Sequence, residues 1–163
     1  MDASLTRDTL GRLLAEENVA LREFESLLER EHDALAKRDI DTLETLAEDR
    51  QANIIRLLEI EEERRSLCGM LGFETDLPGL AKLISWCDPG RTLLHHYEEC
   101  SSRARKCRDL NDRNGILVGA QIKRVEGMLG ALTGSNAEPR AYGPRGQSSA
   151  YSASAGTVLS AEA

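Results

Sequence analysis

Apolar residues return at the period of a helix along the first forty residues of the chain. Between Ser4 and Arg38, apolar pairs recur every seven positions, the repeat of a coiled-coil stripe. The pairs are Leu13-Leu14, Ala20-Leu21, Leu27-Leu28 and Ala34-Leu35. No proline, and no glycine after Gly11, interrupts the stripe. The pattern predicts one helix of roughly 50 Å, which must lie along a partner of similar length.

A second helix follows a short interruption. The stretch from Arg38 to Asp41 breaks the stripe, and Asp41 followed by Glu44 resembles a capping box. The short joint predicts an antiparallel hairpin, with the second helix running to about Leu71. Residues 59–66 hold six charged residues and a single isoleucine, so we expect loose packing there.

The third long helix carries the most regular pattern. A short helix over Leu80–Cys87 is expected between a glycine-rich loop and the turn Asp88-Pro89-Gly90. From Thr92, a predicted N-cap, apolar or amide residues then recur at alternating spacings of three and four for forty residues. This seam consists of Leu93, Tyr97, Cys100, Ala104, Cys107, Asn111, Asn114, Val118, Gln121, Val125, Met128 and Leu132. Amides on a seam more often fix register and orientation than add stability.

Together these patterns predict an all-α fold. We expect an elongated antiparallel up-and-down bundle of three long helices plus one short helix, with coiled-coil-like packing over residues 1–132. Residues 133–163 are rich in Ala, Ser and Gly and show no periodic stripe. A segment of this composition is predicted to be a flexible, disordered tail.

Composition narrows the function classes. The 163 residues carry a net charge of −7, which argues against a nucleic-acid partner. The excess of negative charge lies on the first two helices, whereas residues 77–132 are mildly basic, so we expect the basic side chains from Arg103 to Arg113 to face the acidic hairpin. Residues 1–14 contain no apolar signal region, and no apolar stretch is long enough to span a bilayer. We therefore expect a cytoplasmic protein without membrane insertion.

Candidate chemistry is sparse. The four cysteines show no Cys-x-x-Cys pair, and we interpret them as reduced thiols. His96 and Cys100 lie one helical turn apart, but no second cluster supplies further metal ligands. Three histidines on amphipathic helices form no nucleophile–base arrangement. We predict no enzyme activity, no cofactor and no metal.

The end of the third long helix is the best candidate for binding a partner. Apolar residues form a second band there, beside the seam. Either the short helix or the loop near Leu71 and Phe73 covers this band, or the band receives an amphipathic helix of a partner. The candidate partner-binding residues are Leu110, Ile116, Leu117, Ile122, Val125, Leu129, Leu132 and, in the tail, Tyr142.

Two stretches resemble the C-terminal signature of the FlgN-type flagellar export chaperones. They are Leu110-Asn111-Asp112-Arg113-Asn114-Gly115-Ile116-Leu117 and Ala141-Tyr142-Gly143-Pro144-Arg145-Gly146. The resemblance implies a cytoplasmic chaperone that binds the C-terminal helices of the hook-filament junction proteins FlgK and FlgL. It also implies that the chaperone keeps these proteins unassembled and delivers them to the flagellar export gate, with Tyr142 as a contact to the gate.

Two other function classes stay open at this point. A structural coiled-coil adaptor would self-associate through the third long helix, and a homodimer is compatible with the pattern. A metal-dependent regulator would use His96 and Cys100. Mixing the chain with a C-terminal peptide of a junction protein separates the chaperone from the adaptor.

Overall fold

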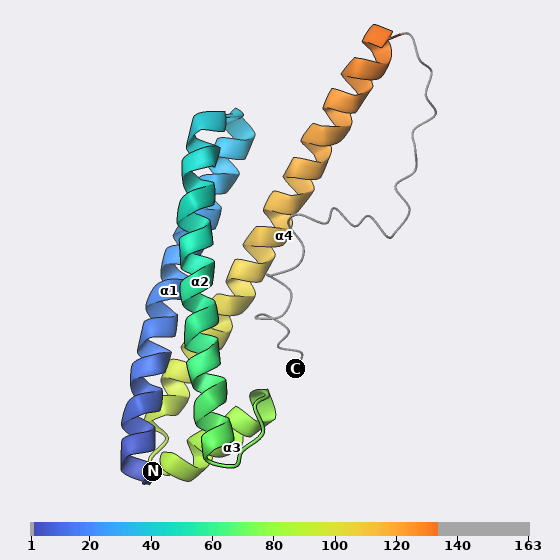
Figure 1. Cartoon of the computed structure of the whole chain (residues 1–163). Helices are drawn as coiled ribbons and strands as arrows, with labels where there is room; N and C mark the ends of the chain where they lie inside the picture. The colour runs from blue at the N-terminus through green and yellow to red at the C-terminus, as the bar shows by residue number, and fades with distance from the viewer. Residues whose placement is uncertain (1, 134–163) are drawn as a thin grey trace.

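The computed structural model describes residues 2–133, and every regular element in that range is a helix. Helix α1 spans Ala3–Lys37, α2 spans Ile40–Met70, α3 spans Leu77–Cys87 and α4 spans Thr92–Thr133. In Figure 1, α1 and α2 form a long hairpin, α3 lies across its open end, and α4 returns along the hairpin and projects beyond its tip. The predicted all-α bundle of three long helices and one short helix is confirmed. The predicted tail and the 141–146 motif lie outside the described residues.

The second helix begins two residues earlier than the sequence suggested. Arg38 adopts a left-handed conformation (φ 57°) that ends α1. Asp39, rather than Asp41, caps α2, because its carboxylate accepts a hydrogen bond of 3.1 Å from the Thr42 amide. The turn is therefore tighter than the predicted capping box at Asp41 and Glu44 required.

Aspartates also set the ends of the two later helices. Asp76 accepts a hydrogen bond of 2.8 Å from the Gly79 amide, so α3 begins at Leu77 and not at the predicted Leu80. Asp88 accepts one of 2.6 Å from the Leu93 amide. Thr92, expected to be the N-cap, is instead the first residue of α4, and its hydroxyl donates to Asp88.

The core lies at the α3 end of the hairpin. Leucines of α1, among them Leu10, Leu14 and Leu28, pack with Leu57, Ile60 and Leu67 of α2, with Leu83 of α3 and with Cys100 and Cys107 of α4. The main packing partners of α1 are α2 and α4. Helix α1 is thus the central helix of the bundle.

Loose packing around residues 59–66 was a wrong expectation. Ile60 is buried, and Arg64, which belongs to the charged stretch, forms an ion pair of 3.0 Å with Glu17 of α1. Both side chains are largely shielded from water. Burial raises the pKa of Glu17, while the charge of Arg64 opposes that rise. The charged stretch therefore joins the two helices instead of separating them.

Helices α1 and α4 run parallel and are joined by a ladder of side-chain hydrogen bonds. Four side chains of α4 donate to leucine carbonyls of α1, and each pair is 86 residues apart. The pairs are Cys100 to Leu14 (3.3 Å), Cys107 to Leu21 (3.5 Å), Asn114 to Leu28 (2.8 Å) and Gln121 to Leu35 (2.6 Å). We call this series the register ladder.

Candidate partner-binding surface

The distal segment of α4, residues 122–133, has no helix beside it within the described chain. The last rung of the register ladder joins Gln121 to Leu35, and α1 ends two residues after Leu35, at Lys37. At 1.5 Å per residue, α4 continues for about 18 Å beyond this rung. Figure 1 shows this segment projecting past the hairpin tip.

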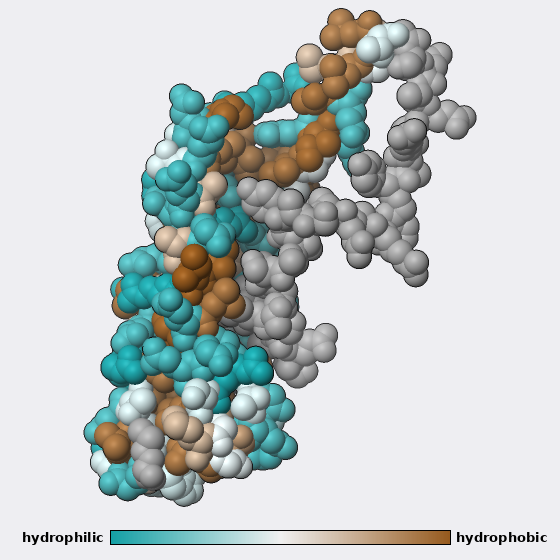
Figure 2. Space-filling view, viewed as in Figure 1, coloured by the Kyte–Doolittle hydropathy of each residue, from teal (hydrophilic) through white to brown (hydrophobic). Residues whose placement is uncertain are grey.

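Apolar side chains on this segment form one continuous stripe. Ile122, Val125, Met128, Leu129 and Leu132 are each 54% to 82% exposed. At about 100° per residue they share roughly a third of the helix circumference. Val125, Met128 and Leu132 continue the seam by which α4 contacts α1. We call these five residues the distal stripe, and Figure 2 shows apolar side chains gathered along this end of the molecule.

The other predicted binding residues lie elsewhere. Leu110 is half-buried and packs against the core, so it belongs to the bundle. Leu117 is half-buried next to the start of the stripe. Ile116 is 76% exposed but lies on the opposite side of α4 from the stripe. Tyr142 lies outside the described residues.

The short helix does not cover the apolar residues at the end of α4, which was one of the two possibilities that the sequence left open. Helix α3 packs against α1 and α2 at the other end of the hairpin. Met128, which was predicted for the seam but not for the binding site, belongs to the distal stripe. Its position on the seam could have identified it as a binding residue, because the seam of α4 continues beyond the end of α1.

Between the core and the distal stripe, five polar side chains join the three long helices. Asn114 donates to the Leu28 carbonyl and, at 2.8 Å, to Glu31. Its oxygen lies 3.1 Å from Nδ1 of His32. Arg50 of α2 donates to both carboxylate oxygens of Glu31 at 2.9 Å and to the Asn111 oxygen at 2.6 Å.

We call these five side chains, Glu31, His32, Arg50, Asn111 and Asn114, the polar junction. Both Asn111 and Asn114 come from the stretch that resembles the chaperone signature. The buried residues Ala34, Leu35 and Leu46 lie on the tip side of the junction and outside the main core cluster. The junction therefore separates the core from the part of the molecule that carries the distal stripe.

The family model described as FlgN protein matches residues 1–150, which is most of the chain. The chain belongs to the FlgN family. This family consists of flagellar export chaperones, proteins that act in flagellum assembly and protein export. No curated protein and no solved structure was found to match the chain.

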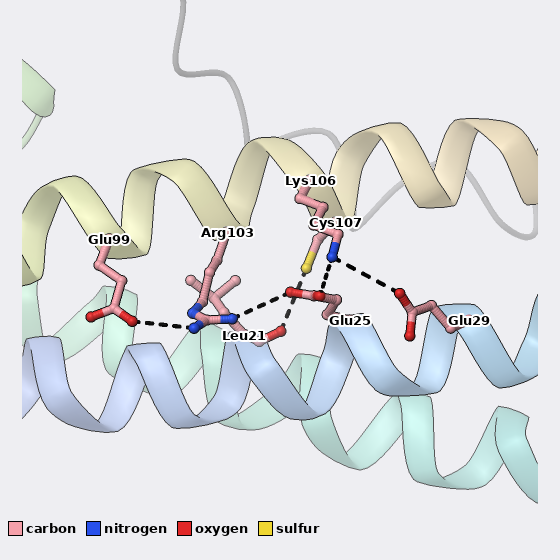
Figure 3. A network of polar contacts seen from close by, with 7 residues as sticks. All are labelled: Leu21, Glu25, Glu29, Glu99, Arg103, Lys106 and Cys107. Atoms are coloured by element: carbon pink, nitrogen blue, oxygen red, sulfur yellow. Dashed lines mark hydrogen bonds and ion pairs between the residues drawn. The ribbon is translucent and has the colours of Figure 1, made fainter.

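In this FlgN chain, two of the five basic side chains between Arg103 and Arg113 pair with carboxylates of the acidic hairpin, as expected. Arg103 pairs with Glu25 of α1 at 3.4 Å and with Glu99 of its own helix at 3.2 Å. Lys106 pairs with Glu25 and, at 3.9 Å, with Glu29. Figure 3 shows the carboxylate of Glu25 between the two cations. These ion pairs reinforce the side-by-side packing of α1 and α4.

The buried thiols of the FlgN chain act as packing and hydrogen-bonding groups. Burial raises the pKa of Cys100 to about 12 and that of Cys107 to about 11. A cysteine binds a metal ion as its thiolate, so a raised pKa opposes metal binding by Cys100 together with His96. Within residues 2–133, no three His, Cys, Asp or Glu side chains cluster as metal ligands would. Within the same range, no helix is apolar over a length that could cross a bilayer.

Proposed function

We propose that this FlgN-family chaperone binds the C-terminal helices of the hook-filament junction proteins FlgK and FlgL on the distal stripe. In the cytoplasm it keeps them from assembling and delivers them to the flagellar export gate. The observation that supports this proposal is the row of five exposed apolar side chains on a segment of α4 that no other helix of residues 2–133 lies beside.

The chemistry of the stripe suits an amphipathic helix. Monomeric proteins rarely leave large apolar side chains exposed in a continuous row, and such rows mark interaction sites. Helices that lie on such a surface bury apolar residues at spacings of three and four. Burying one such side chain contributes about 1.5 to 3 kcal/mol, so each stripe residue that a client helix covers strengthens binding. No covalent step and no cofactor is needed for this kind of binding.

A matched pair of variants tests the client site. Leu129→Glu places a charge within the distal stripe, whereas Ile116→Glu places the same charge on the opposite side of α4. Both side chains are already exposed, so neither change disturbs the core. Calorimetry with a C-terminal peptide of FlgK should show binding lost for Leu129→Glu and unchanged for Ile116→Glu. Equal binding by both variants would contradict the proposed client site.

Delivery to the gate needs a second contact, for which we propose Tyr142. An aromatic ring beside Gly143 and Pro144 loses little conformational freedom on docking into a pocket. A pull-down with the cytoplasmic domain of the export gate should fail for Tyr142→Ala, while the affinity for the FlgK peptide stays the same. Unchanged gate binding would remove Tyr142 from the mechanism.

The distal stripe also suits a second candidate function, a self-associating adaptor. Two copies could bury their stripes against each other, because each presents the same apolar helix face. Light scattering of the purified chain separates the two cases. A dimer that resists added FlgK peptide favours the adaptor, whereas a dimer or monomer that converts to a one-to-one complex favours the chaperone.

A further inference from the structure

We propose that the polar junction selects the register at which α4 packs on α1, and so sets how much of α4 is free to bind a partner. In this view its five side chains are positioning residues. The link to partner binding rests on the proposed function, whereas the selection of register does not.

The register ladder alone does not define one register. Its acceptors, from Leu14 to Leu35, and its donors, from Cys100 to Gln121, both repeat every seven residues. After a slip of seven residues, about 10.5 Å along the helix, three of the four rungs could form again. The apolar seam repeats at the same interval and tolerates the same slip.

The polar junction does not repeat in this way. A slip of α4 by seven residues would place either Ala104 or Val118 opposite Arg50, where Asn111 now accepts a hydrogen bond of 2.6 Å. Neither of these side chains has an acceptor. In the slip toward α3, Asn114 would also leave Glu31 and His32 and move to the level of Leu21. Buried polar groups that lose their partners destabilise the state in which this happens, so the junction disfavours both slipped registers.

The choice of register has a direct consequence for the distal stripe. In the observed register, twelve residues of α4 follow the last rung at Gln121. A slip of one heptad toward α3 would leave five, and would bring Val125 and Met128 alongside the hairpin. The partner site would then lose most of its length. A polar group on an apolar seam that specifies register is a well-attested device in coiled coils.

The test compares Asn114→Leu with Cys107→Ala as its control. Both changes remove one rung of the ladder, but only the first disrupts the junction. Spin labels on Lys37→Cys and Ile116→Cys report the axial offset of α1 and α4. Because the native thiols are buried, labelling near neutral pH is confined to the two introduced cysteines.

We expect a single distance in the parent and in Cys107→Ala, and a second, displaced distance in Asn114→Leu. We also expect Asn114→Leu to bind the FlgK peptide at least tenfold more weakly, although it stays folded, and Cys107→Ala to bind it normally. A single unchanged distance in Asn114→Leu would overturn the proposal.

A second variant covers the case in which Asn114→Leu fails to fold. The double change Glu31→Gln with Arg50→Gln removes both charges of the junction together, so that no lone charge is left between the helices. The same displaced distance is expected. If the parent itself does not bind the FlgK peptide, the proposed function fails, while the distance measurement still decides whether the junction sets the register.

Discussion

The same Leu→Ala truncation should lower stability at one position of the chain and weaken partner binding at another. Leu28→Ala removes a side chain that is 1% exposed in the core. Leu129→Ala removes the same atoms from a side chain that is 55% exposed on the distal stripe. The chemical change is equal, so any difference between the two variants reports the surroundings of the side chain.

The structure gives the size of the stability effect. A buried Leu→Ala change costs the transfer free energy of the lost atoms plus a cavity term, about 3 to 4 kcal/mol together. For a domain of this size, each kcal/mol lowers Tm by about 3 °C, so Leu28→Ala should lower Tm by roughly 10 °C. Truncation of Leu129 removes few packing contacts, because its side chain is exposed and no other helix in residues 2–133 lies beside it, and alanine is a good helix former. Its replacement should change the free energy of unfolding by less than about 0.5 kcal/mol.

Partner binding should show the reverse order. If Leu129 is buried by a client helix, its truncation should weaken binding by about 1.4 kcal/mol or more, which is tenfold in Kd. Leu28→Ala leaves the distal stripe unchanged and should bind with the parent affinity at a temperature where it is folded.

The assay combines thermal unfolding, followed by circular dichroism at 222 nm, with calorimetric titration of a FlgK C-terminal peptide. A decrease in Tm for Leu129→Ala as large as that for Leu28→Ala would refute this prediction. That result would mean that the distal stripe is covered by another part of the chain and is not free for a partner.

Three further predictions concern the frame that holds the site. Gly79→Ala should strongly destabilise the fold in thermal unfolding, because a Cβ at this position would lie 1.9 Å from the carbonyl oxygen of Glu74. The hydrogen bond from the Leu93 amide lowers the pKa of Asp88 below its ordinary value of 3.8. The carboxylate therefore stabilises the folded state above that pH, and its contribution should disappear as the pH falls below about 3.8, so that unfolding curves of Asp88→Asn and the parent converge in acid. Cys100 and Cys107, with raised pKa values, should react with a thiol reagent at pH 8 only after denaturant unfolds the chain.

The sequence by itself determined the helices and most of their ends. The heptad repeat of apolar pairs and the seam from Leu93 onward are local patterns, and a helix is the conformation that brings such residues to one face. The exclusion of Ile116 from the stripe also follows from helical geometry alone, although Ile116 was among the predicted binding residues. The cap at Asp39 was placed two residues late because Asp39 and Asp41 are equally good N-caps, and only the left-handed Arg38 decides between them.

Only the tertiary structure decided which part of α4 extends past the other helices of residues 2–133 (Figure 1). The sequence indicated that the amides of the seam would fix a register, but not that Asn114 meets Leu28 and Gln121 meets Leu35, 86 residues earlier in the chain. Nor could it place Arg50 of α2 between Glu31 and Asn111. Periodicity describes one helix at a time, whereas register and exposure depend on where two helices stand along each other. The last rung, from Gln121 to Leu35, lies two residues before the end of α1, and this offset leaves the distal stripe beyond that end.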